Sequence, residues 1–233
     1  RYAFELGLLG GQPRWWVQSD LDGMALTLPA PLTKGAATKL PLRVESQLTP
    51  ESLRPKSKVQ HDQIKVSLGK QVNVMYVRDV SGASARVLRG VMTVGNAPET
   101  TMQEGAVRLV LQLPYVDLDA WTNALAQTAG VTWVKGKSPS KHIGLEASAD
   151  NAQDYLPTEL NVKAEQLKIS ERMIHQVAAT GTRVRDVWRF QVAADELNGA
   201  IEVRPPQGNT PAQLHARLAY LVIPPSMVQD VEH

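Results

Sequence analysis

The chain has 233 residues, no cysteine, and 25 Lys and Arg residues against 23 Asp and Glu residues. The absence of cysteine excludes disulfides, thiolate nucleophiles and Cys-ligated zinc. A formal net charge of +2 is too small to indicate a nucleic-acid-binding protein. No stretch of the sequence approaches the roughly 20 apolar residues that cross a bilayer. The chain starts at Arg1 within a strand-like pattern, which predicts that it is part of a longer protein.

Apolar and polar residues alternate with a period of two along most of the chain. The clearest examples are residues 40–44, 64–68, 107–113, 160–164, 190–194 and 214–218. Strict alternation is typical of antiparallel strands with one apolar and one polar face. The spacing predicts about a dozen such strands. Turns or bulges are expected at the glycines that interrupt the pattern: Gly23, Gly69, Gly82, Gly181 and Gly199.

One segment has helical spacing instead. Leu118, Trp121 and Leu125 recur at i, i+3 and i+7, with Asp117 or Asp119 available as N-cap and Gly130 beyond the end. This pattern predicts one short helix near 117–128. The polar stretch 130–155 is expected to link two β segments, 1–129 and 156–233.

No catalytic or metal-binding pattern is found in the sequence. None of the histidines has a partner at metal-ligand spacing. The pairs Asp20/Asp22 and Asp117/Asp119 are better explained as a turn and a helix cap. We therefore expect neither an enzyme nor a bound cofactor or metal.

Three arginines near a tryptophan are the remaining candidate for a binding site, in this case for nucleic acid. Arg183, Arg185 and Arg189 surround Trp188 and could stack on bases and contact phosphates. A polar strand face explains them more simply, and we expect no nucleic-acid partner.

A dozen one-faced strands can pack in two ways. A two-sheet β-sandwich would bury the two apolar faces against each other. A long curved sheet would leave its apolar face open and in need of a ligand, such as acyl chains. Each CH₂ group moved from water onto an apolar wall contributes about 0.8 kcal/mol, so ten carbons contribute about 8 kcal/mol. Composition alone does not decide between these two architectures.

The order of several motifs is similar to that of a known family. Residues 19–34 and 40–44 resemble the S-D-L-x-G-hydrophobic-x-L-x-L-P-x-P-L-x-K … L-P-L-R stretch of the YhdP family. Residues 118–121 resemble its L-D-x-W helix start, and residues 156–157, 160–169, 187–190 and 216–224 match its closing strands in order. The resemblance covers nearly the whole chain and is weakest between about Gly130 and Tyr155.

The resemblance implies both an architecture and a function. YhdP proteins resemble the AsmA-like envelope proteins of Gram-negative bacteria, which are anchored in the inner membrane and span the periplasm. They form a long, twisted β-groove implicated in carrying phospholipid toward the outer membrane, which supports its permeability barrier. This chain would be an internal to C-terminal-half, periplasmic segment without the anchor. Its partners would be phospholipid acyl chains, neighbouring segments of the full-length chain and the two membranes.

On this interpretation, the fold is mainly β, a long curved antiparallel sheet, and its alternating apolar residues line the groove. The expected lining residues are Leu109, Leu111, Leu160, Val162, Phe190, Val192, Leu214 and Leu218. Their polar neighbours Arg43, Lys163, Arg189 and Arg217 would face the periplasm.

Two alternatives remain open at this point. A non-catalytic assembly scaffold would pair its exposed sheet edges with other chains or segments. A carbohydrate-active enzyme on a β-sandwich would need two carboxylates facing each other across a cleft.

Overall fold

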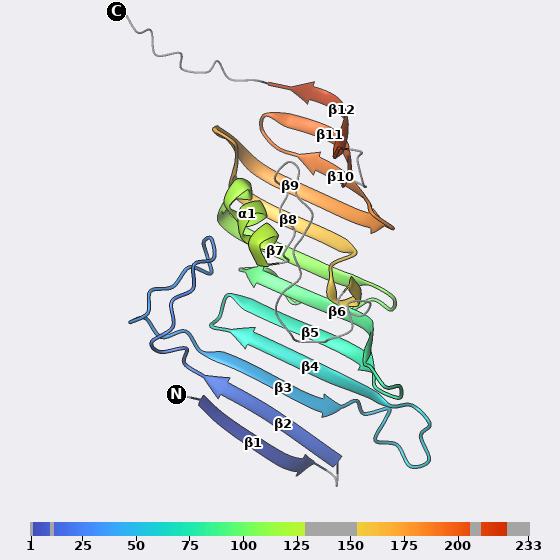
Figure 1. Cartoon of the computed structure of the whole chain (residues 1–233). Helices are drawn as coiled ribbons and strands as arrows, with labels where there is room; N and C mark the ends of the chain where they lie inside the picture. Colours follow the sequence, from blue (N-terminus) through green and yellow to red (C-terminus); the bar gives the residue numbers. More distant parts are fainter. Residues whose placement is uncertain (1, 10–11, 129–152, 206–210, 223–233) are drawn as a thin grey trace, which may run out of the picture.

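The computed structural model describes residues 2–9, 12–128, 153–205 and 211–222. These residues form one twelve-stranded sheet in which the strands follow one another in chain order (Figure 1). The strands are β1 (Tyr2–Leu9), β2 (Gln12–Ser19), β3 (Leu42–Leu48), β4 (His61–Leu68), β5 (Val72–Asp79), β6 (Arg86–Gly95), β7 (Val107–Asp117), β8 (Glu159–Ile169), β9 (Arg172–Val184), β10 (Val187–Ala193), β11 (Leu197–Arg204) and β12 (Gln213–Leu221). The helices are α1 (Leu118–Thr128) and the 3₁₀ turn η1 (Gln153–Tyr155).

The long single sheet and the short helix predicted from the sequence are confirmed. The prediction of antiparallel pairing holds for most of the sheet, but β7 runs parallel to both β6 and β8. Parallel neighbours need a connection that returns to the same end of the sheet. Residues 96–106 make that return before β7, and the connection carrying α1 and η1 makes it before β8. The described residues form one sheet rather than the alternative two-sheet sandwich.

Two expectations for local structure fall on the glycines within strands and on the predicted linker. Gly199 does lie at a β-bulge, but Gly181 lies within β9, paired with Leu160 and Phe190, and the prediction of a break there is wrong. Most of the predicted linker 130–155 is outside the described residues, and its last three residues form η1. The division of the chain into segments at this linker stays a prediction.

The best-packed part of the sheet lies beneath α1. Leu113, Val116, Ala164, Val177 and Ala194 form a buried cluster, and Trp121 of α1 packs against it. In β9, the pairing with β8 skips Gln176, which has a positive φ of 51°. This irregularity shifts the alternation, so that Ile174 faces the same cluster as Val177. A second layer therefore covers the sheet here, and α1 and η1 both lie in front of the same face in Figure 1.

The start of α1 is fixed by an N-cap. Oδ1 of Asp117 accepts a hydrogen bond of 2.8 Å from the backbone N–H of Ala120. This bond lowers the pKa of Asp117, as does the ammonium group of Lys168 at 3.3 Å. The cap ends β7 and turns the chain onto the face of the sheet.

Candidate functional site

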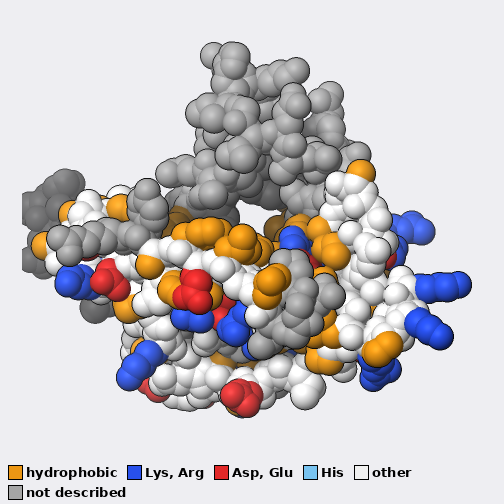
Figure 2. Space-filling view, turned by 90° about the horizontal axis from the view of Figure 1, so that it is seen from below, with side chains coloured by type: hydrophobic (Ala, Val, Ile, Leu, Met, Phe, Trp, Pro, Cys, Tyr) orange, Lys and Arg blue, Asp and Glu red, His pale blue; other side chains and the backbone are white. Residues whose placement is uncertain are grey.

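One face of the sheet is apolar from the first strand to the last. Because directly paired residues share a face, the register defines a continuous row across all twelve strands. The row is Phe4, Val17, Val44, Val66, Val74, Met92, Leu109, Leu160, Gly181, Phe190, Ile201 and Ala216. We call the side that carries this row the apolar face. Figure 2 shows hydrophobic side chains gathered on this side of the sheet.

All eight residues expected to line a groove lie on this apolar face. Leu109, Leu160 and Phe190 belong to the row just described. Leu111, Val162, Val192 and Leu218 form the next row together with Ala179 and Gly199. Leu214 is paired with Val203 in edge strand β12 and is 67% exposed. The structure thus brings these residues onto one surface.

The opposite face is polar and carries the four expected outward residues. Arg43 is paired with Gln18 and Ser67, and Lys163 with Gln112 and Ala178. Arg189 is paired with Glu202, and Arg217 with Ala200. Charges on this face are largely matched across strands, as in the pair between Arg108 and Glu159 at 2.6 Å. We call this side the polar face.

A hollow of about 880 Å³ lies on the polar face of β9–β12. Its polar side chains include Thr180, Arg189, Glu202 and Arg217. Hydrogen bonds from Arg204 and then Arg189 lower the pKa of Glu202. Two of the predicted lining residues, Phe190 and Leu214, also border this hollow. Its polar side chains belong to the polar face, which distinguishes it from the predicted groove on the apolar face.

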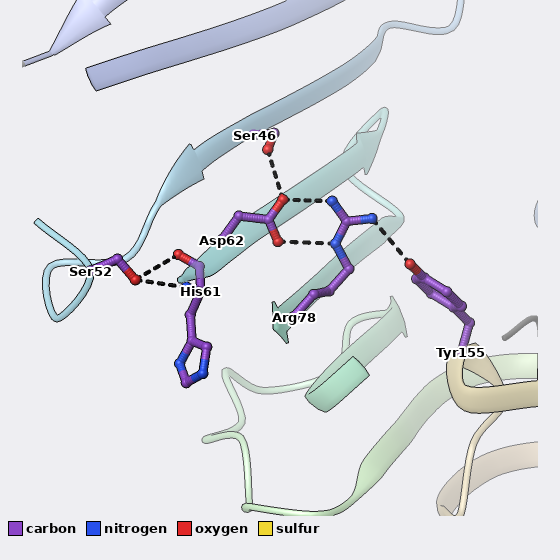
Figure 3. Close-up of polar contacts among 6 residues, drawn as sticks. All are labelled: Ser46, Ser52, His61, Asp62, Arg78 and Tyr155. Atoms are coloured by element: carbon purple, nitrogen blue, oxygen red, sulfur yellow. Dashed lines mark hydrogen bonds and ion pairs between the residues drawn. The ribbon is translucent and has the colours of Figure 1, made fainter. Parts of the chain in front are cut away.

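A buried polar cluster bounds the apolar face at one end of β3–β5 (Figure 3). Asp62 is only 7% exposed and pairs with Arg78 of β5 through two hydrogen bonds of 3.0 and 2.5 Å. Ser46 donates a further bond of 3.3 Å to Asp62. The hydrogen bonds to Asp62 raise the pKa of Arg78. A bidentate pair with every charge satisfied is the form in which ions are tolerated away from water.

The same cluster fastens η1 to the sheet. Arg78 donates a hydrogen bond of 3.0 Å to the phenol oxygen of Tyr155, and the hydroxyl of Tyr76 donates one of 2.8 Å to the Tyr155 carbonyl. The two tyrosine rings meet edge to face at 5.1 Å. Burial, followed by the neighbouring Tyr155, raises the pKa of Tyr76 to about 12. This phenol therefore remains protonated and can donate throughout the physiological pH range.

A second boundary is formed by the long β2–β3 connection, residues 20–41. The ammonium group of Lys34 is buried within it and donates to the carbonyls of Leu21, Met24 and Gly35 at 2.8, 2.5 and 3.1 Å. The indole N–H of Trp121 donates to the carbonyl of Ala30 at 3.1 Å. The connection is therefore tied to α1.

Two aromatic rings lie flat on the apolar face because a glycine sits opposite each of them. A Cβ atom at Gly90 would come within 2.4 Å of the Tyr76 ring, and one at Gly181 within 2.5 Å of the Phe190 ring. The paired glycines leave space for the rings to lie against the backbone. The rings therefore protrude less from the floor than they would above a larger residue.

The arginine group around Trp188 does not form one basic patch. Arg183 is paired with Trp188 on the apolar face, Arg189 lies on the polar face, and Arg185 lies in the turn between β9 and β10. No group of three metal-ligating side chains occurs within the described ranges. Within those ranges, too, no helix has the length and apolar character needed to cross a membrane.

Sequence reasoning missed the polar residues that bound the apolar face. Lys34 belongs to the recognised motif, but nothing in its spacing indicates an ammonium group buried among carbonyls. Asp62 and Arg78 are far apart in the sequence and meet only through the β4–β5 register. Their signal was a charge at the end of an otherwise apolar alternation, which by itself is common.

Comparison with known families shows to which family the chain belongs. The model of the family described as YhdP protein matches residues 11–232. The chain belongs to the YhdP family. The match includes the β2–β3 connection, the helix α1 and the closing strands on which the resemblance was based. YhdP proteins are AsmA-like proteins of the cell envelope. No match was found among curated proteins or among solved structures.

Proposed function

We propose that this chain is a periplasmic segment of an inner-membrane-anchored protein that conducts phospholipid between the inner and outer membranes. The apolar face would solvate the acyl chains, and the polar face would contact water. By this activity the full protein would support the permeability barrier of the outer membrane. The proposal rests on membership of the YhdP family together with the architecture of the sheet.

The observation that carries the proposal is the unbroken apolar row. α1 packs against β7–β9 and η1 against β5–β6, and among the described residues no second sheet covers the rest. Phe4 at one end of the row is 62% exposed. An apolar surface of this extent is unusual on a monomer and typically binds a ligand. Acyl chains fit because each CH₂ placed on such a wall contributes about 0.8 kcal/mol without specific contacts.

The test compares charges on the two faces. Leu214→Asp places a carboxylate on the apolar face of edge strand β12, and His215→Asp places one on the polar face of the adjacent position. Both side chains are exposed, so both variants should fold. Lipid bound by the purified chain is measured by native mass spectrometry and by analysis of an organic extract.

We expect about one or more phospholipids per chain in the wild type and in His215→Asp, and clearly less in Leu214→Asp. The interior pair Leu160→Asp and Asn161→Asp repeats the comparison at the centre of the row. Wild-type protein free of lipid, or equal loss in both members of a pair, would count against the proposal. Thermal unfolding separates loss of lipid from loss of fold.

The alternative function, an assembly scaffold, is favoured by the open sheet edges. Leu6 and Leu8 of β1 are 66% and 76% exposed, and Leu221 of β12 is 52% exposed. Unpaired strand edges readily accept a further strand. Lipid-free protein that associates through β1 or β12 would support this function over lipid conduction.

A further inference from the structure

Two of the arginines on the apolar face, Arg78 and Arg183, have very different surroundings. Arg78 is held by two hydrogen bonds to Asp62 and a third to Tyr155. Arg183 lies on the same face, two residues along β9 from Gly181. No carboxylate in the described part of the chain forms an ion pair with Arg183. This half-buried guanidinium is therefore available to an anionic group of a ligand.

The guanidinium of Arg183 is held at the end of an aromatic stripe. Its central carbon lies 5.8 Å from the ring centroid of Trp188, which is the cation–π range. Trp188 in turn stacks on Phe190, with centroids 5.5 Å apart and ring planes within 12°. Phe190 lies over Gly181, so the stripe follows the floor of the apolar face. Stacking orients the planar guanidinium and leaves N–H groups available to a bidentate acceptor.

Arg183 also borders a small hollow of about 270 Å³. Val107, Gly105, Thr158 and Asp154 are among the other residues that line it. The hydroxyl of Thr158 accepts a bond from the backbone N–H of Val107. Among the residues that line the hollow, Arg183 is the one with a cationic side chain. Asp154 is the opposing charge, and its carboxylate would weaken the binding of an anion here.

We propose that Arg183 binds the phosphate of a phospholipid whose acyl chains lie over Trp188 and Phe190. This assignment rests on the proposed function, because it needs acyl chains on the apolar face. The planar fork of an arginine fits two phosphate oxygens, and the aromatic stripe begins where the head group ends. Arg183 would therefore be the position at which a lipid is held, whereas the apolar rows bind acyl chains without preference for a position.

The experiment compares two lipids with the same acyl chains. Phosphatidylglycerol carries the phosphate and diacylglycerol does not. Each is added in detergent to delipidated protein, and bound lipid is measured by native mass spectrometry. The variant is Arg183→Gln, with Arg183→Lys as a charge-retaining second variant. Arg185→Gln is the matched control, because it removes the same charge from the exposed turn two residues away.

We expect the wild type and Arg185→Gln to prefer phosphatidylglycerol by about tenfold, as for a hydrogen bond to a charged group. Arg183→Gln should bind both lipids at the diacylglycerol level, and Arg183→Lys should retain part of the preference. Asp154→Asn should increase the preference, because it removes the opposing charge from the hollow.

The possible failures differ from one another. A preference that survives in Arg183→Gln would overturn this assignment while leaving acyl-chain binding intact. Absence of binding by both lipids in the wild type would overturn the proposed function and the assignment together. Soluble glycerophosphoglycerol that competes as well as the lipid would show a site for free phosphate esters, and would also overturn the assignment to a lipid.

Discussion

A methyl group added at Gly181 tests whether the glycines set the height of the aromatic rings. The Cβ atom would lie 2.5 Å from Cδ1 and Cε1 of Phe190. Ordinary contact between carbon atoms begins near 3.5 Å, so the ring must move by about 1 Å. The φ of Gly181 is outside the left-handed region, so alanine adds no backbone strain. The effect of Gly181→Ala is therefore steric.

The expected magnitude follows from overpacking. Extra volume in a packed site costs about 2 kcal/mol. For a chain of this size each kcal/mol lowers Tm by about 2–4 °C, so Gly181→Ala should lower it by roughly 4–8 °C. Thermal unfolding followed by circular dichroism measures the change. The matched control is Gly7→Ala in β1, where an added Cβ meets no atom within 4 Å. Its Tm should stay constant or rise slightly.

A second substitution separates ring displacement from other causes. Phe190→Leu in the Gly181→Ala background replaces the ring with a smaller side chain, and it should recover part of the lost stability. The reasoning would be refuted if Gly181→Ala unfolded at the same temperature as Gly7→Ala. It would also be refuted if Phe190→Leu worsened the Gly181→Ala variant as much as it worsens the wild type.

Three further predictions concern the boundaries of the apolar face and the cap of α1. Asp62→Ala leaves Arg78 without its carboxylate and should lower the free energy of unfolding, measured in urea, by about 3 kcal/mol. The double variant Asp62→Ala with Arg78→Met should lower it much less, because no charge is left unpaired. Equal losses in the two variants would contradict a buried pair. Trp121→Phe removes the hydrogen bond to the carbonyl of Ala30 and should lower the free energy of unfolding by about 1 kcal/mol. Limited proteolysis should then cut residues 20–41 faster than in the wild type. The pKa of Asp117 is lowered in the folded state, so the stabilisation from this carboxylate is complete at pH values above the ordinary aspartate pKa of about 4. That contribution is lost as the pH falls through the lowered pKa, so unfolding curves from pH 6 to 2 should depend less on pH in Asp117→Asn.

The faces of the sheet could be predicted from the sequence because alternation is a local property. Leu160 and Phe190 each occupy an apolar position in the alternation of their own strand. They lie on the same side of the sheet because both are paired with Gly181. The start of α1 could be predicted for the same reason, since Asp117 caps a backbone N–H only three residues away. Local rules are sufficient where the deciding contacts are close in the sequence.

The features that could not be predicted depend on contacts between distant residues. Gly181 had the signature of a break in a strand, and only its pairing with Phe190 shows that it makes room for a ring. The parallel orientation of β7 follows from how residues 96–106 cross the sheet, which composition does not reveal. The contact between Trp121 and Ala30 joins residues 91 positions apart. Closeness in the sequence also placed Arg183 and Arg189 in one basic group, although the register puts them on opposite faces.

The distribution of polar groups on the apolar face bears on whether lipid is held or conducted. From Val17 to Met92 the central row contains only aliphatic side chains, and the charged pair of Asp62 and Arg78 lies at the strand ends rather than within it. An acyl chain displaced along such a row exchanges one aliphatic contact for another, so its free energy changes little. Arg183 breaks this uniformity at β9, where a phosphate would gain a charge-assisted contact. Movement would therefore be easy along most of the sheet and slowest at Arg183, and Arg183→Gln should shorten the residence time of a phospholipid more than that of a diacylglycerol.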